Sequence, residues 1–181
     1  MRRLAAAGVN VSVDTMRADV AAAAVEAGAV LVNDVSGGLA DPDMLPTVAR
    51  LGVHYVAMHW RGHSDRMVDL ARYDDVVAEV CAELSARLDA AVAAGVARDR
   101  IILDPGLGFA KTAEHNWALL NHLEALGGLG RPLLVGASRK RFLGELLADD
   151  VGPRPVRERE DAGVALTTLL SDAGVWGVRT H

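Results

Sequence analysis

Six stretches of this 181-residue chain place polar side chains directly after a short apolar run, where they could bind a ligand. The most informative is residues 101–111, in which Ile-Ile-Leu is followed by Asp104, Pro105 and a loop with two glycines. Pro105 ends the strand that the apolar run predicts, so Asp104 lies at its carboxyl end. The glycines let a ligand come close to the backbone. Asp104 is therefore a candidate site residue, although an Asp here could also cap its own turn.

Three of the strand ends carry acidic or amide side chains. Asp14 and Asn33 follow the predicted strands 9–13 and 29–32, as Asp104 follows its own. Two carboxylates and an amide suit a flat heterocycle with adjacent ring N–H and amino donors, because a carboxylate accepts such a pair bidentately. The alternative is local turn capping at each position.

Two further strand ends carry cations. An Arg-Lys-Arg run at 139–141 follows the apolar run 132–136, and Arg179 and His181 follow the last run. These side chains are donors for an anion such as a phosphate or a carboxylate. The alternative is a solvated helix start, but three cations there oppose the helix macrodipole, and a bound anion would explain them. We therefore expect a local anion site that includes Lys140.

Other chemistries lack support in the sequence. It has no Ser-His-Asp or Cys-His arrangement and no phosphate-binding glycine motif, because the Gly-Leu-Gly of residues 106–108 lacks the third glycine. His59 and His63 are close in sequence, but they fall in a loop with no acidic partner at metal-site spacing. The lone Cys81 excludes a disulfide framework and a cysteine-based zinc site.

The composition predicts a globular α/β chain, since 51% of the residues are hydrophobic and only 4% are aromatic. A net charge of -5 argues against a general nucleic-acid binder, whose basic surface would show in the total. No apolar stretch is long enough to cross a membrane, so we expect a cytoplasmic protein.

A repeated unit positions these side chains: a β-favouring run, a polar residue at its end, a loop, and an amphipathic helix closed by glycine. Thr15 and Thr112 are predicted helix N-caps. The longest predicted helix turns Val77, Val80, Leu84, Leu88 and Val92 to the core. Helices are predicted at 4–7, 15–27, 43–51, 73–94 and 156–173, and strands at 9–13, 29–32, 53–57, 101–103, 132–136 and 175–178.

Six strands of this kind could form a doubly wound sheet or a (β/α)8 barrel. A doubly wound sheet draws ligand groups from two or three strand ends, whereas a barrel draws them from many. Because all six strand ends are polar or site-like here, the barrel is favoured. A barrel takes about 250 residues. We therefore expect residues 1–181 to form a single partial α/β domain, a TIM-barrel fragment with about six of eight strands.

Six motifs follow one another along the chain: Ser-Val-Asp-Thr-Met-Arg at 12–17, Asn-Asp-Val-Ser-Gly at 33–37, Met-His at 58–59, Asp-Pro-Gly-Leu-Gly-Phe-Ala-Lys at 104–111, Gly-Ala-Ser-Arg-Lys-Arg-Phe at 136–142 and Gly-Val-Arg-Thr-His at 177–181. Together they resemble the dihydropteroate synthases, a pterin-binding enzyme family, and in particular its actinobacterial members. The resemblance implies a transferase of folate biosynthesis and a sulfonamide target. Such an enzyme joins p-aminobenzoate to hydroxymethyldihydropterin diphosphate and releases pyrophosphate.

The resemblance also implies residue roles. The loop 61–72 would help to cover the p-aminobenzoate pocket. Lys140, Arg179 and His181 would be catalytic, because they stabilise the leaving group. The pterin would be held by Asp14, Asn33, Asp104 and Lys140 with Met58 and Phe109 near its faces, the diphosphate by Arg179 and His181, and p-aminobenzoate beside Ser138 and the Lys140-Arg141 turn.

The implied reaction is substitution at a methylene carbon, so positioning and leaving-group electrostatics suffice without an enzyme nucleophile. The family further implies a Mg²⁺ cofactor. Its expected ligand belongs to an N-terminal loop without a counterpart here, since the chain lacks the family's N-terminal part and last helix. The expected partners are the two small-molecule substrates, with no nucleic acid and no membrane, and a homodimer is left open.

Two alternative functions stay open at this point. A pterin-dependent methyltransferase-type barrel would share the pterin contacts but would not need the anion side formed by Ser138, Arg139 and Lys140. An inactive or regulatory pterin-binding fragment would bind the pterin without turning over both substrates.

Overall fold

The computed structural model describes residues 1–63 and 65–181, so one position of the predicted loop 61–72, residue 64, lies outside the described residues. The chain divides into two compact units. The first unit consists of residues 1–60 and 82–103, and the second unit of residues 61–81 and 104–181. All six predicted strands are present, four in one sheet and two in another.

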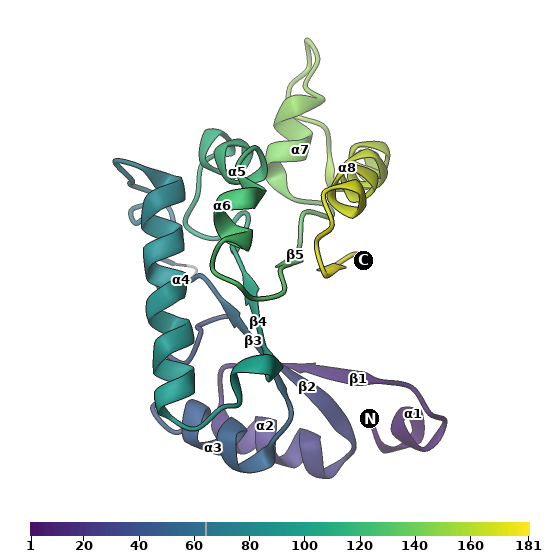
Figure 1. Cartoon of the computed structure of the whole chain (residues 1–181). Coiled ribbons are helices and arrows are strands. Elements are labelled where there is room, and N and C mark those ends of the chain that lie inside the picture. Colours follow the sequence, from purple (N-terminus) through teal and green to yellow (C-terminus); the bar gives the residue numbers. More distant parts are fainter. Residues whose placement is uncertain (64) are drawn as a thin grey trace. The chain divides into compact units, whose positions relative to one another are not determined.

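The sheet of the first unit has the strand order β1-β2-β3-β4. Neighbouring strands β1, β2 and β3 are parallel, and the register pairs Asp14 with Asn33 and Asn33 with Val56. The carboxyl ends of these strands therefore lie at one edge. Helix α2 packs on β2 and on α3 (Figure 1). The elements are α1 (Arg2–Ala6), β1 (Val11–Asp14), α2 (Ala18–Glu26), β2 (Ala29–Asp34), α3 (Met44–Leu51), β3 (His54–Met58), η1 (Arg98–Arg100) and β4 (Ile101–Asp104).

Strand β4 is buried at all four positions, as its unbroken apolar run predicts for a strand covered on both faces. Helix α4 (Val76–Ala93) starts in the second unit and continues in the first. Leu84 and Leu88 on α4 are almost completely buried. The core of the first unit also contains Val32, Met44, Val48, Tyr55, Val56, Ile101 and Leu103.

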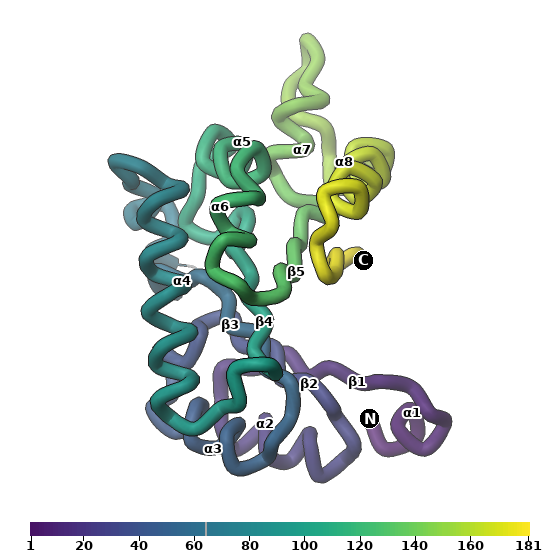
Figure 2. Tube along the Cα trace, in the orientation of Figure 1, coloured from purple at the N-terminus to yellow at the C-terminus, as the bar shows by residue number. Residues whose placement is uncertain are grey.

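The second unit contains the short parallel strands β5 and β6, which lie side by side near the C-terminus (Figure 2). Leu134 pairs with Gly177 and Val135 with Val178. The core of this unit includes Leu107, Leu119, Leu126, Val135, Leu143 and Leu170. Its elements are α5 (Ala113–Leu120), α6 (Leu123–Gly127), β5 (Leu134–Val135), α7 (Arg141–Leu146), η2 (Val156–Glu158), α8 (Glu160–Asp172) and β6 (Gly177–Val178).

Three helices begin later than the sequence predicts, at Ala18, Val76 and Glu160. The Thr15 hydroxyl accepts a hydrogen bond from the Arg17 N–H at 3.1 Å, so it closes a turn instead of capping α2. On α4, Val92 is 39% exposed whereas Ala91 is fully buried, so the predicted apolar face is wrong at that end. Helix α5 begins directly after Thr112, as predicted.

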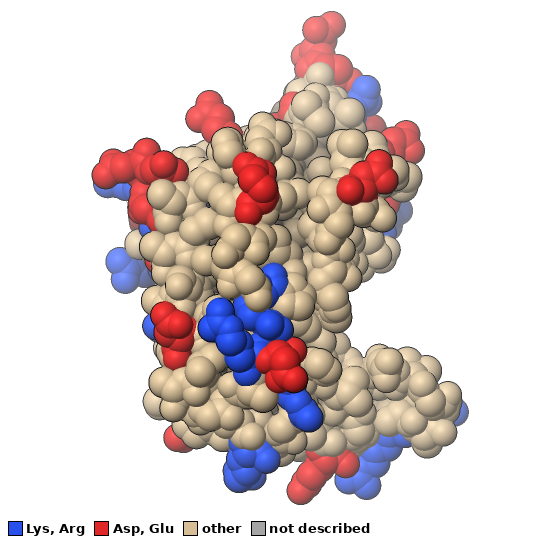
Figure 3. All heavy atoms as spheres, in the orientation of Figure 1, with Lys and Arg blue, Asp and Glu red and all other residues tan. Residues whose placement is uncertain are grey.

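The surface carries both signs of charge. Figure 3 shows acidic and basic side chains interspersed among uncharged ones on the face that it draws. Within residues 1–63 and 65–181, no helix combines the length and the apolar character that crossing a membrane requires.

Candidate active site

In the first unit, the strand-end side chains bind one another. The Asn33 amide donates to the Asp14 carboxylate at 2.9 Å, across the register that pairs these two residues. Asn33 is only 5% exposed, whereas Asp14 is open to solvent. Met58, at the end of β3, is buried. The structure therefore brings the predicted Asp14 and Asn33 together and places Met58 in the core of the same unit.

A second carboxylate, Asp34, organises the loop after β2. It is fully buried, and its oxygens accept hydrogen bonds from Ser36 N–H, Ser36 O–H, Gly38 N–H and the Tyr55 hydroxyl at 2.7–2.8 Å. Burial raises the pKa of Tyr55 well above its ordinary value, and the charge of Asp34 adds to the shift. Asp34 fixes the backbone that follows Asn33. This role of Asp34 was not predicted, although the Asn-Asp pair at the end of a strand was a signal for it.

His59, considered above as a metal ligand, lies beside a glutamate instead. Its ring Nε2 lies 2.9 Å from Glu83 Oε2 on α4, and the His59 side chain is almost completely buried. No group of three or more His, Cys, Asp or Glu side chains among the described residues could hold a metal ion.

In the second unit, Asp104 is the centre of the site. It is 1% exposed, and its Oδ1 accepts from the Gly106 N–H at 2.8 Å. Its Oδ2 accepts from Arg179 Nη1 at 2.8 Å, although the two residues are far apart in sequence. A Cβ at Gly136 would lie 2.8 Å from Arg179 Nη1, so only glycine leaves room for this arginine. Asp104 and Arg179, predicted for opposite ends of the substrate, form one ion pair.

Lys140 lies beside that pair. Its ammonium is 4.2 Å from the centroid of the Phe109 ring, and its stem passes so close to Gly108 that a Cβ there would be 3.0 Å from Lys140 Cδ. Burial lowers the pKa of the Lys140 ammonium, the Asp104 charge opposes that effect, and the Arg179 charge adds to it. Lys140 and Phe109 thus form one edge of the site.

The remaining predicted residues fall into two groups. The His181 ring Nδ1 lies 3.1 Å from the Ser138 hydroxyl, so the ends of β5 and β6 bring these two together. Arg139 and Arg141 instead pair with the carboxylates of Glu160 and Glu145, each at 2.8 Å. The expectation that Arg139 and Arg141 add donors to the anion site is therefore not supported by their contacts.

Asn116 is a further functional residue of this site that sequence reasoning left without a role. Its side-chain oxygen accepts from the Gly108 N–H at 2.8 Å, and its amide donates to the Thr112 carbonyl at 2.7 Å. It is buried on α5. Asn116 therefore fastens the glycine loop that follows Asp104 to the helix behind it.

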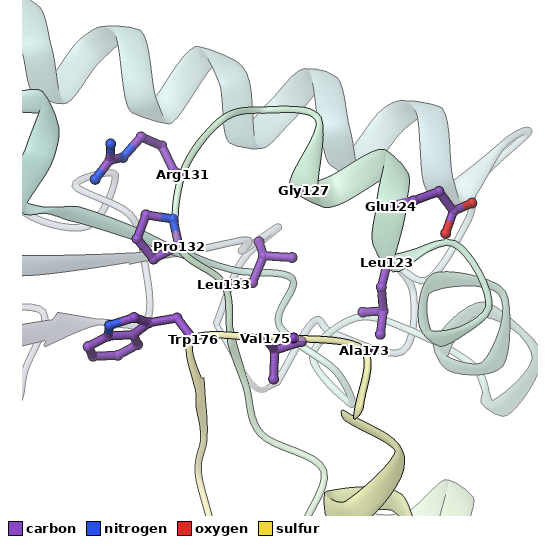
Figure 4. A pocket seen from close by; sticks show the side chains of 10 residues that line it. Leu123, Glu124, Gly127, Arg131, Pro132, Leu133, Ala173, Val175 and Trp176 are labelled. Carbon is purple, nitrogen blue, oxygen red and sulfur yellow. The ribbon is translucent and has the colours of Figure 1, made fainter. Parts of the chain in front are cut away.

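Two cavities of the second unit differ in their relation to these residues. One, of about 470 Å³, is lined by Gly108, Lys111, Asn116, Lys140 and neighbouring side chains. A larger one, of about 590 Å³, lies at the amino ends of β5 and β6 and is lined by Leu123, Pro132, Val175 and Trp176 among others (Figure 4). None of the predicted site residues lines the larger cavity, whereas Lys140 lines the smaller one. The smaller cavity is therefore the candidate binding site.

Comparison with known proteins identifies relatives of this chain. A dihydropteroate synthase of Mycobacterium leprae (strain TN) is 56% identical over 100% of this chain, which covers 64% of that relative. The structure of the Thermus thermophilus dihydropteroate synthase in complex with 4-aminobenzoate matches with a TM-score of 0.90 and 43% identity over 99% of this chain and 68% of that one. The Xanthomonas albilineans enzyme in complex with 7,8-dihydropteroate matches with a TM-score of 0.88 and 41% identity over 99% and 64%.

These matches confirm the predicted TIM-barrel fold class and the family resemblance. The chain spans about two thirds of the length of the relatives that it matches. The family model of the pterin binding enzymes matches residues 1–181, from end to end of the chain. The motifs, the strand-end geometry and this match agree, and the chain belongs to the pterin binding enzyme family.

Proposed function

We propose that this chain carries the pterin- and anion-binding part of a dihydropteroate synthase. The reaction joins 4-aminobenzoate to hydroxymethyldihydropterin diphosphate, in folate biosynthesis. The observation that carries the proposal is the arrangement of Asp104, Arg179 and Lys140 in one unit, an acceptor for a heterocycle beside two cations for a diphosphate. The two structural relatives were solved with 4-aminobenzoate, a substrate of this reaction, and with 7,8-dihydropteroate, its product, and these ligands support the same reaction here.

The pterin end is assigned to Asp104. A carboxylate offers about four acceptor positions, so Asp104 keeps capacity for pterin N–H donors beside its bonds to Gly106 and Arg179. Phe109 offers a ring face, and Lys140 a further donor. The roles of Asp14, Asn33 and Met58 at the pterin stay predictions that rest on the motif match.

The anion end is assigned to Lys140, Arg179 and His181, with Ser138 beside the aminobenzoate. The amine nitrogen lone pair forms the new N–C bond at the methylene carbon while the C–O bond to the diphosphate breaks, and its electron pair leaves with pyrophosphate. The amine proton passes to solvent or to the leaving group. Preorganised cations stabilise the charge that develops on the leaving oxygen, so no enzyme nucleophile is needed.

Four finer expectations stay proposals: a Mg²⁺ cofactor, a cytoplasmic location, a homodimer and sulfonamide binding. The described residues do not fit a Mg²⁺ site, because they offer no cluster of three or more acidic or histidine ligands. We therefore assign no step of the reaction to the metal within this chain.

The test compares Lys140→Ala and Arg179→Ala with Arg157→Ala, a matched change at an exposed arginine of η2. Lys140→Ala should lose both turnover and pterin affinity, because Lys140 is also a donor to the pterin. Arg179→Ala should lose far more turnover, measured by pyrophosphate release, than affinity for a plain pterin without diphosphate, measured by calorimetry. Equal loss of both in Arg179→Ala would overturn the leaving-group assignment. A chain that binds the pterin but never turns over both substrates would be a pterin-binding module instead.

A further inference from the structure

Two residues with side chains adopt a left-handed backbone within the described chain, Ala110 with φ 47° and Arg139 with φ 61°. This conformation is unfavourable for residues other than glycine, and it persists only where surrounding contacts hold it. Ala110 directly follows Phe109, and Arg139 directly precedes Lys140. The two strained positions therefore flank the two residues whose ring and ammonium lie 4.2 Å apart.

A tyrosine outside the glycine loop holds the first position. The Tyr73 hydroxyl donates to the Ala110 carbonyl at 3.1 Å. The Tyr73 ring is itself held, because the Arg61 guanidinium stacks 3.8 Å from its centroid and the His115 ring meets it edge-on at 4.9 Å. Arg61 is fixed in turn by an ion pair with Glu79 at 2.7 Å. These contacts fix the Tyr73 hydroxyl as a donor to the carbonyl of Ala110, whose backbone is left-handed.

An arginine holds the second position. Arg159 donates from Nη1 to the Arg139 carbonyl at 2.9 Å and from Nε to the Arg154 carbonyl at 2.8 Å. It lies directly over Gly144 of α7, where a Cβ would be 2.5 Å from Arg159 Nε. The Arg139 side chain points to Glu160, so only its backbone takes part. On both sides of the Phe109–Lys140 pair, a side-chain donor therefore binds the carbonyl of a left-handed residue.

We propose that Tyr73 and Arg159 are positioning residues, which hold the Phe109 ring and the Lys140 ammonium together for the pterin by fixing the strained backbone at Ala110 and Arg139. The role in ligand binding rests on the proposed function, whereas the geometric role does not. The hydrogen bonds link each residue to the pair through the carbonyl of the neighbouring left-handed residue.

The sequence makes a direct test simple, because the chain has only two lysines, Lys111 and Lys140. The whole chain is labelled with ¹³C-lysine. The ε-methylene signal of Lys140 should then be shifted upfield by the ring current of Phe109, because the end of the Lys140 side chain lies over that ring. Lys140→Arg assigns the signal. Tyr73→Phe, which keeps the ring and removes the donor, should move it towards the value of a free lysine and weaken binding of a plain pterin about three- to tenfold.

Arg159→Lys should have the same effects, and Arg157→Lys is its matched control. In an Ala110→Gly background the effect of Tyr73→Phe should nearly vanish, because glycine adopts the left-handed backbone without support. A purely structural role would lower the melting temperature without moving the Lys140 signal, which would overturn the proposal. So would an equal effect of Tyr73→Phe in both backgrounds. If the unmodified chain binds no pterin, the proposed function fails, and the Lys140 signal still decides the geometric role.

Discussion

The strand ends of the two units differ in the hydrogen bonds that fix them. In the first unit the polar side chains bind one another and the loop that follows β2, as in the pair Asp14–Asn33 and the four bonds to Asp34 from two hydroxyls and two backbone N–H groups. In the second unit the side chains are charged and sit on loops, and the loops are fastened by bonds from side chains to backbone, such as those of Asn116 and Tyr73. We propose that the second arrangement presents charge to a ligand, whereas the first mainly fixes the fold.

The lengths of the strands explain this difference. The first unit pairs strands of four to six residues, so ladder hydrogen bonds fix the strand ends. Strands β5 and β6 have two residues each, so the ladder ends before the site begins. Long loops cost entropy to order, and single side-chain donors on loop carbonyls offset part of that cost. We expect the first unit to respond to mutations mainly in stability and the second mainly in binding.

The largest effect should follow Asp34→Ala in the first unit. The hydroxyls of Tyr55 and Ser36 would lose their acceptor inside the core, and each unsatisfied buried group costs about 1–3 kcal/mol. We expect the free energy of unfolding to fall by about 3–4 kcal/mol, as measured by urea denaturation. Asp14→Ala, at an exposed position, is the control and should change the stability by less than about 1 kcal/mol. Equal effects of the two changes would break the comparison between the units.

The next effect concerns Asp104→Asn in the second unit. Loss of a charge-assisted contact costs about 1.5–3 kcal/mol, so plain pterin affinity should fall about 10- to 150-fold in calorimetric titration. The stability loss should be smaller than that of Asp34→Ala, because asparagine still accepts from Gly106 or Arg179. Unchanged pterin affinity would remove Asp104 from the site.

A smaller effect should distinguish Thr15 from Thr112, although the sequence predicts both as helix N-caps. The Thr112 hydroxyl accepts from the His115 N–H at 3.3 Å at the start of α5, whereas Thr15 only closes a turn. Thr112→Ala should lower the free energy of unfolding by about 1 kcal/mol, the usual value of an N-cap. Thr15→Ala should have a clearly smaller effect in the same denaturation experiment. The reverse order would show that the observed cap is not what stabilises α5.

The smallest effect is a pH dependence at the same helix start. The His115 Nδ1 accepts from the Thr112 N–H at 3.2 Å, which requires the neutral ring. Burial lowers the pKa of His115 below its ordinary value of 6.5, so its contribution is complete above that pH. The contribution is lost as the pH falls through the lowered pKa. First-turn amides of α5 should therefore exchange faster at about pH 5 than at pH 7, relative to intrinsic rates.

His115→Asn, which keeps an acceptor that does not titrate, should abolish this pH dependence. Amides of β2 in the first unit serve as the internal reference. A pH dependence that persists in His115→Asn would assign the effect to another group.

The sequence by itself determined those strands and helix starts whose positions depend only on neighbouring residues. Each strand is an apolar run stopped by a polar residue, so the positions of Asp14, Asn33 and Asp104 at strand ends follow from their neighbours alone. The N-cap at Thr112 is equally local. Helix starts at 15, 73 and 156 were predicted too early, because a turn or a 3₁₀ segment before a helix has the same composition as its first turn.

Only the tertiary structure decided which of these side chains meet. The pairing of Asp104 with Arg179 joins residues at the ends of two distant strands, and no spacing in the sequence predicts it. The same holds for Glu160, which pairs with Arg139. The Arg141–Glu145 pair differs, because these residues are four apart on α7 and helix geometry alone brings them together. The left-handed backbone at Ala110 is likewise invisible in the sequence, because alanine does not favour it and a tyrosine hydroxyl from another segment of the chain holds it.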